Sequence, residues 1–531
     1  MEHAPALTVS TNRLSALRYA QDERWWSLPL LALLTGLTSA FAFEPVGWWP
    51  LMIVAFGLLA ELIRRTRTMK SALITGWAFG FGQFVLGLNW IATAFTYQAA
   101  MPAWLGWIAV VLLSLYLAVY PALATGLAWR FGQQSRLALV LALAGGWAIT
   151  EYLRALMFTG FAWNPVGVVL NDTGLLDTAT VVGTYGLSAM VVLTGGAGFL
   201  LVHRAVKEAF FLLMGLAALA TLVESPALRA PSGQAVQIVQ PNIGQENKWT
   251  DGYADVAARK LANLSQPIGT PRLVFWPEAA VTEPLQDDRR GPPQAFARFE
   301  RTRAASVLGP RDYLLTGGIA FFSRDGRLIT GAANSVFTLR PSGEILHRFD
   351  KAHLTPYGEY LPMRSVLEPL GLSRLAPGGI DFTPGPGPQT VTLPGWGRIG
   401  IQICYEIIFS GQVVDKRNRP DFIFNPSNDA WFGAWGPPQH FAQARLRAAE
   451  EGLPVVRSTP TGISGLIDAR GRVVSSLPWQ QAGVINGNLP PPTAEPTPFA
   501  RHGNWLSMIF AFGLLITAIV LDARRRYRRA I

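Results

Sequence analysis

Long apolar runs that are nearly free of charged residues fill positions 25–223 of this 531-residue chain. A helix of about 20 apolar residues spans the hydrocarbon core of a membrane and pairs its own backbone polar groups there. Positions 224–503 differ, because charges, turn residues and short β-rich segments alternate along them. The sequence therefore predicts a membrane-embedded helical part followed by a globular part.

Hydropathy predicts eight membrane-spanning helices, seven before residue 224 and one after residue 503. The expected spans are 25–42, 46–63, 71–96, 103–127, 136–158, 179–202, 208–223 and 504–521. An alternative for the first span is a cleavable signal peptide, since Ala40-Phe41-Ala42 resembles a cleavage site. We expect this span to be retained, because a long polar stretch precedes it and six further spans follow.

Basic residues cluster in alternate loops between these spans. The formal net charge is +11, but the clusters bound apolar runs, which favours topology signals over nucleic-acid binding. The clusters are Arg13, Arg18 and Arg24; Arg64, Arg65, Arg67 and Lys70; Arg130 and Arg136; Arg204 and Lys207; and five arginines between positions 524 and 529. With these segments in the cytoplasm, residues 224–503 lie on the opposite side of the membrane.

The globular part has the segment pattern of an α/β fold. Strand candidates are Val236–Val239, Leu273–Trp276, Tyr313–Thr316, Ser335–Leu339, Ile399–Cys404, Phe422–Asn425, Val455–Ser458 and Val484–Gly487. Helix candidates are Gly252–Leu264, Pro293–Leu308 and Gln439–Glu450. We expect four units: a membrane domain at 1–223, a catalytic α/β domain at 224–489, a proline-rich linker at 490–503, and a last span with a basic tail at 504–531.

Three reactive side chains lie where a buried strand is expected to end: Glu278, Lys351 and Cys404. Cys404 is the only cysteine, so no intramolecular disulfide can form, and the six scattered histidines show no spacing typical of metal ligands. A thiol with a pKa near ~8.5 needs a base or a cation beside it to react at neutral pH. Taken alone, Cys404 could be a small buried apolar residue, and Glu278 and Lys351 could be surface charges. Their combination favours a nucleophilic cysteine with a glutamate as base and a lysine as cation.

The ordered trio resembles the Glu-Lys-Cys triad of the carbon-nitrogen hydrolase (nitrilase) superfamily, and the neighbouring residues match as well. Together with the spans, the chain resembles the apolipoprotein N-acyltransferase family over nearly its whole length. The similar segments are Trp276-Pro277-Glu278, Asp350-Lys351, Cys404-Tyr405-Glu406, Gln240-Pro241-Asn242-Ile243, Lys248-Trp249, Leu354-Thr355-Pro356-Tyr357-Gly358-Glu359-Tyr360 and Asn428-Asp429-Ala430-Trp431-Phe432-Gly433. The resemblance implies a membrane α-helical bundle of about eight helices joined to an αββα sandwich, in a multi-pass protein of the bacterial inner membrane with a periplasmic catalytic domain.

The resemblance also implies a two-step acyl transfer without a cofactor. Glu278 acts as general base, Cys404 takes the acyl group of a phospholipid as a thioester, and Lys351 stabilises the oxyanion. The acceptor is the N-terminal amine of a diacylglyceryl-cysteine apolipoprotein, and we expect a monomer that contacts membrane lipids. Supporting roles are implied for Glu359, Glu406 and Tyr405.

Three tryptophans, Trp249, Trp431 and Trp435, are candidates for the acyl-binding surface or the membrane interface, with packing in the core as the alternative. One departure from the family pattern is Pro460, where asparagine is expected. Proline lacks a backbone donor, so a hydrogen-bonding role for that position is in doubt.

Two other functions remain open at this stage. A membrane-anchored amidase of the nitrilase type would use water as the acceptor, although eight spans favour substrates that reside in the bilayer. A transporter with an external domain would place ionisable residues within its spans. The few such residues here are Glu61, near a span end, and Glu151 with Arg154, which are one helical turn apart.

Overall fold

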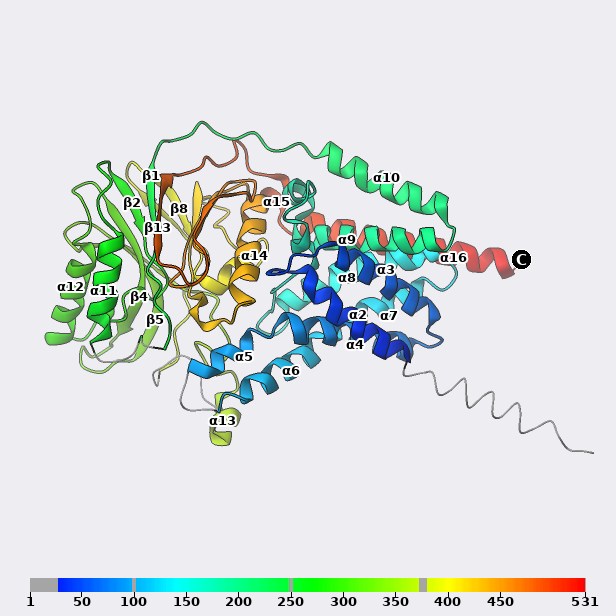
Figure 1. Ribbon diagram of the computed structural model, residues 1–531, viewed down its shortest axis with the longest axis horizontal. Coiled ribbons are helices and arrows are strands. Elements are labelled where there is room, and N and C mark those ends of the chain that lie inside the picture. The colour runs from blue at the N-terminus through cyan, green and yellow to red at the C-terminus, as the bar shows by residue number, and fades with distance from the viewer. Residues whose placement is uncertain (1–26, 98–101, 247, 249–251, 372–379, 531) are drawn as a thin grey trace, which may run out of the picture.

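The computed structural model describes residues 27–97, 102–246, 248, 252–371 and 380–530. A helical bundle and an α/β part lie side by side, and the last helix returns from the α/β part into the bundle (Figure 1). That helix, α16 (Trp505–Ala530), packs against α8 and α9. The bundle is therefore built from both ends of the chain.

The helical bundle contains α2 (Ser27–Ser39), α3 (Pro50–Arg65), α4 (Met69–Gly87), α5 (Ile91–Ala94), α6 (Leu105–Leu117), α7 (Val119–Phe131), α8 (Arg136–Leu156), α9 (Ala179–Val202), α10 (Val206–Leu222) and α16. Side-chain caps start two of these helices: Thr68 accepts the N–H of Ser71 before α4, and Ser135 accepts the N–H of Ala138 before α8. At Gly36 of α2, an added Cβ would lie 2.0 Å from the carbonyl oxygen of Phe79 on α4. Close backbone approach at small residues is typical of helix packing in membranes.

Each of the eight predicted spans overlaps helix in the structure. Among the described residues, four helical stretches are long and apolar enough to cross a membrane, at 105–131, 136–156, 176–202 and 505–528. A fifth is obtained if the bent pair at 69–87 and 91–97 is one span. The helices α2, α3 and α10 have 13, 16 and 17 residues, short of the roughly 20 that a span needs. The expectation of eight crossings therefore remains a prediction.

The α/β part contains two sheets. One has the order β13-β1-β2-β4-β5-β6, with β3 beside β4, and the other has the order β12-β11-β10-β9-β8-β7. The strands of the first sheet are β1 (Ala235–Gln240), β2 (Arg272–Phe275), β3 (Pro284–Asp287), β4 (Tyr313–Phe322), β5 (Gly331–Leu339), β6 (Ile345–Asp350) and β13 (Gly483–Asn488). Those of the second are β7 (Thr390–Leu393), β8 (Gly397–Ile401), β9 (Phe422–Pro426), β10 (Val455–Ser458), β11 (Gly465–Ile467) and β12 (Val473–Ser476).

The layers follow the order α, β, β, α, as predicted. Buried residues of both sheets, among them Phe275 and Phe424, form one core between the sheets. A second core packs α11 (Tyr253–Leu264) and α12 (Pro292–Ala305) on the first sheet. On the other side, α14 (Gly436–Glu451) covers the second sheet and separates it from the bundle (Figure 1). The α14 layer therefore lies at the junction of the two parts.

Two local predictions need correction. The strand expected at Ile399–Cys404 ends at Ile401, the last residue of its pairing with β9, and Cys404 lies beyond it in a left-handed turn with a φ of +52°. The segment expected to be only a proline-rich linker contains the short helix α15 (Pro498–His502), with a proline at its first position and Thr497 as its cap. A further short helix of the α/β part, α13 (Arg364–Leu367), follows β6.

Candidate active site

Cys404 follows β8 and opens the 3-10 helix η6 (Cys404–Ile408). Its φ of +52° lies in the left-handed region, which costs a residue with a Cβ roughly 1–2 kcal/mol. Non-glycine residues persist in this conformation only where the surroundings hold them, and such residues cluster at functional sites. The side chain is buried, with 7% of its surface exposed. The sharp turn therefore presents the thiol at the end of the sheet.

Lys351 follows β6 and lies between two buried carboxylates. Its Nζ is 2.9 Å from Oε2 of Glu359 and 3.6 Å from Oε1 of Glu278. The side-chain amide of Asn334, on β5, donates to both carboxylates, to Oε1 of Glu278 at 2.7 Å and to Oε1 of Glu359 at 2.8 Å. Three residues predicted from the sequence, at positions 278, 351 and 359, therefore form one cluster, and Asn334 is a member that the sequence did not indicate.

The charged groups of this cluster shift the pKa of the Cys404 thiol. Burial and the Glu278 carboxylate raise the pKa of Cys404 well above its ordinary value, against the opposing effects of Lys351 and the N–H of Asn428. Burial disfavours the Lys351 ammonium, but Glu359 and Glu278 outweigh it and raise the pKa of that lysine. The resting site thus holds a protonated thiol and a cationic lysine. Oε2 of Glu278 is buried and has no hydrogen-bond partner within the described ranges, so it is free to accept a proton.

Glu406 links the turn that carries Cys404 to the loop that carries Lys351. Its Oε1 accepts the N–H groups of Ala352 at 2.7 Å and His353 at 3.0 Å, and its Oε2 accepts the N–H of Ile403 at 2.7 Å. Burial raises the pKa of Glu406 to about 7, and these N–H groups oppose the shift. The contacts are consistent with a supporting role, because they fix the two loops that carry Lys351 and Cys404.

The remaining candidates lie toward the helical bundle. The hydroxyl of Tyr405 donates to the carbonyl of Gly160 at 3.2 Å. The ring of Trp431 lies 6.1 Å from that of Tyr97, and the ring of Trp435 lies 5.9 Å from that of Phe41; both tryptophans are partly exposed. Trp249 lies outside the described residues. Trp431 and Trp435 therefore lie at the junction between the α/β part and the helical bundle.

Pro460 follows β10, and its carbonyl accepts the N–H of Ile243 at 3.2 Å. The position thus does take part in a hydrogen bond, through an acceptor that proline retains.

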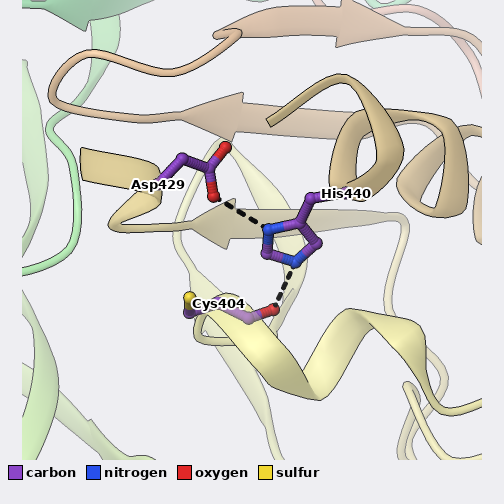
Figure 2. A group of neighbouring side chains, drawn as sticks. All are labelled: Cys404, Asp429 and His440. Carbon is purple, nitrogen blue, oxygen red and sulfur yellow. Dashed lines mark hydrogen bonds and ion pairs between the residues drawn. The ribbon is translucent and has the colours of Figure 1, made fainter. Parts of the chain in front are cut away.

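Sequence reasoning missed a second cluster beside Cys404. A carboxylate oxygen of Asp429, a ring nitrogen of His440 and the sulfur of Cys404 all lie within 4.8 Å of one another (Figure 2). Such a donor set can hold a metal ion in principle. Here Arg457 donates to Oδ2 of Asp429 at 2.7 Å, so a guanidinium already supplies the positive charge.

A sequence signal for this cluster did exist. The strands β8, β9 and β10 are parallel neighbours, and Cys404, Asp429 and Arg457 lie at or after their carboxyl ends. Functional side chains gather there in α/β folds. His440, by contrast, comes from α14, and no local pattern places it. Lys248, part of a matching segment to which the sequence assigned no role, is also buried; burial lowers its pKa to about 8, while Glu278 opposes the shift.

Comparisons with known proteins agree with this architecture. The family model described as the apolipoprotein N-acyltransferase N-terminal domain matches residues 35–197, and the carbon-nitrogen hydrolase model matches residues 236–499. An apolipoprotein N-acyltransferase of Rhodopseudomonas palustris is 33% identical over 526 residues, covering 94% of this chain and 96% of that protein. The apolipoprotein N-acyltransferase of Allorhizobium ampelinum is 35% identical over 520 residues, with the same two coverages.

A third relative, the apolipoprotein N-acyltransferase of Bradyrhizobium diazoefficiens, is 34% identical over 541 residues and covers 97% of this chain and 98% of that protein. Both the helical part and the α/β part are therefore shared with these relatives along nearly their full lengths. This chain belongs to the apolipoprotein N-acyltransferase family.

Proposed function

We propose that this enzyme transfers a fatty acyl group from a phospholipid to the N-terminal amine of a diacylglyceryl-cysteine apolipoprotein, through a thioester on Cys404. The observation that carries the proposal is the buried group of Glu278, Lys351 and the chain's only thiol, at the junction with an apolar helical bundle. The relatives that match over nearly the whole chain are named apolipoprotein N-acyltransferases, which supports the same reaction.

In the first half-reaction, the free Oε2 of Glu278 takes the thiol proton, and the sulfur of Cys404 attacks the ester carbonyl carbon of the phospholipid. The Lys351 ammonium stabilises the resulting oxyanion. When the tetrahedral intermediate collapses, the acyl C–O bond breaks and Glu278 returns the proton to the leaving alkoxide. The products are the thioester and a lysophospholipid.

In the second half-reaction, the amine of the acceptor attacks the thioester carbonyl, and Glu278 accepts the proton that the amine loses. The C–S bond then breaks, which forms the amide and releases the thiolate to be protonated again. Because two carboxylates flank Lys351, its charge persists through both steps. Glu359 and Glu406 hold this geometry, Tyr405 anchors the turn to the bundle, and Trp431 and Trp435 contribute to the lipid-facing surface. For Trp249, outside the described residues, the role in substrate binding stays an expectation from the sequence.

We further propose the setting of the reaction. The helical part spans the bacterial inner membrane eight times, residues 224–489 form a periplasmic catalytic domain, residues 490–503 connect it to the last span, and the protein acts as a monomer. The alternation of basic loops supports this orientation. Four helical stretches of sufficient length, or five with the bent pair, support the membrane location.

The alternative acceptor is water, and one experiment separates the two. Purified enzyme is mixed with phospholipid alone, and intact mass and free fatty acid are followed in time. An acyltransferase accumulates the acyl adduct on Cys404 with little fatty acid, and a diacylglyceryl-cysteine peptide then removes the adduct as an amide. Rapid release of fatty acid that ignores the peptide would overturn the proposal.

Two variants complete this experiment. Cys404→Ala gives no adduct with any phospholipid, because the chain has no other thiol. Glu278→Gln retains shape but lacks the base, so both half-reactions slow by about 10² to 10⁴.

A further inference from the structure

His440, on the first turns of α14, contacts the main chain of the nucleophile. Its side chain is fully buried, and its Nε2 lies 3.1 Å from the carbonyl oxygen of Cys404 (Figure 2). A carbonyl oxygen can only accept a hydrogen bond, so Nε2 carries the proton and donates it. The imidazole therefore holds the backbone of Cys404 and not its sulfur.

The other side of the ring is fixed as well. Nδ1 lies 2.9 Å from Oδ1 of Asp429 and 3.0 Å from Nη2 of Arg457. Arg457 is held in turn by Ser427 and Asn425, and both its side chain and that of Asp429 are fully buried. Burial and the Arg457 charge keep the pKa of His440 below its ordinary value, while Asp429 opposes them, so the ring is neutral and Nδ1 accepts from Nη2 of Arg457. The ionised Asp429 carboxylate cannot donate to Nδ1, so it acts on the ring through Arg457, whose Nη2 also donates to Oδ2 of Asp429 at 2.7 Å.

The same segment also affects the thiol. The backbone N–H of Asn428, the residue before Asp429, lowers the pKa of Cys404, and the side-chain oxygen of Asn428 accepts from Gln245 at 3.0 Å. The hydrogen bond from His440 is made to a residue in the left-handed conformation, with a φ of +52°, which persists only where the surroundings hold it.

We propose that His440 is a positioning residue for the nucleophile: fixed by Arg457, which Asp429 holds in turn, it donates to the carbonyl of Cys404 and keeps that residue in its left-handed turn. His440 does not touch the substrate in this assignment. The inference rests on the proposed nucleophilic role of Cys404, but the first readout of its test, alkylation of the thiol, needs neither an acyl donor nor an acceptor. The two proposals can therefore fail separately.

The test compares His440→Gln with His440→Asn in the full-length enzyme. The longer glutamine can place an amide N–H near the position of Nε2, whereas the asparagine amide reaches only the position of Nδ1 and leaves the Cys404 carbonyl without its donor. Because the chain has one cysteine, the rate of iodoacetamide alkylation against pH reports on Cys404 alone. The rate of thioester formation from phospholipid is the second readout.

We expect His440→Gln to alkylate with the wild-type pH midpoint and to form the thioester within about threefold of the wild-type rate. In His440→Asn the turn relaxes and the sulfur moves away from the Asn428 N–H, which lowers the thiol pKa in the wild type, so the midpoint rises by about one pH unit. Thioester formation slows by about 10²-fold, as expected when a reacting atom moves by about 1 Å. Gln443→Leu, on the same helix and equally buried, removes a side chain that donates within α14 to the carbonyl of Gln439; it is the matched control and keeps both readouts unchanged.

Equal behaviour of the asparagine and glutamine variants in both readouts would overturn the proposal, whether both match the wild type or both are impaired. If His440→Asn fails to fold, His440→Gln decides alone: a midpoint raised by one pH unit together with an unchanged melting temperature would reject the donor role. Loss of thioester formation in wild-type enzyme, with the alkylation difference preserved, would reject the proposed reaction and leave the positioning role intact.

Discussion

Replacement of Lys351 by methionine tests the charge arrangement of the candidate site. The lysine is 2% exposed and lies between Glu278 and Glu359, which share the amide of Asn334. Methionine has a similar length but no charge, so two buried carboxylates lose their cation. Removal of one partner of a buried ion pair typically costs about 3–5 kcal/mol. For a domain of this size, we expect the melting temperature to fall by about 6–20 °C.

The measurement is thermal unfolding of the detergent-solubilised enzyme at several pH values. Without the lysine, repulsion raises the pKa of one of the two carboxylates. When the pKa of a carboxyl group is higher in the folded than in the unfolded state, the folded protein becomes less stable as the pH rises from the unfolded-state pKa to the folded-state pKa. The defect of Lys351→Met should therefore shrink as the pH is lowered. Lys416→Met, which removes an exposed lysine, is the control and should change stability by less than about 0.5 kcal/mol.

A double variant tests the physical cause. Lys351→Met combined with Glu359→Gln leaves a single carboxylate, so part of the lost stability should return, with a coupling energy of about 0.5–3 kcal/mol. Strictly additive effects, or a Lys351→Met variant as stable as the wild type at every pH, would refute the reasoning. The same variant should form the thioester about 10² times more slowly through the lost oxyanion contact.

Three further predictions concern the support of the site and its orientation. Because the pKa of Glu406 is raised to about 7 from 4.5, the wild type should lose stability as pH rises from about 4.5 to 7, and a pH series of melting temperatures should lack this slope in Glu406→Gln. Glu450→Gln leaves Arg447 buried without its partner at 2.9 Å, so it should cost about 3–5 kcal/mol in thermal unfolding, and Arg447→Met in addition should restore part of it. Reporter fusions after Val223 and after Arg529 should report opposite sides of the membrane; the same side for both would contradict the orientation.

The sequence by itself determined the elements that local pattern encodes. Apolar runs of helical length predict the bundle, and all eight predicted strands and three predicted helices of the globular part have counterparts in the structure. It missed β3, β6, β7, β11 and β12. Glu278, Lys351 and Cys404 stood out because a reactive side chain at a strand end is a local signal, and the order of the trio resembles a known family. Periodicity and chemical type are properties of a few consecutive residues, so one sequence suffices to detect them.

Tertiary structure alone decided which residues meet. Asn334 lies within a buried strand, and only the pairing of β4, β5 and β6 brings it between Glu278 and Glu359. His440 is 36 residues from Cys404, and it reaches the nucleophile only because α14 packs over the second sheet. Strand order and layer packing follow from burial summed over the whole chain, and no short segment encodes that sum. The left-handed turn at Cys404 has the same origin, since its strain is sustained by contacts from segments distant in sequence.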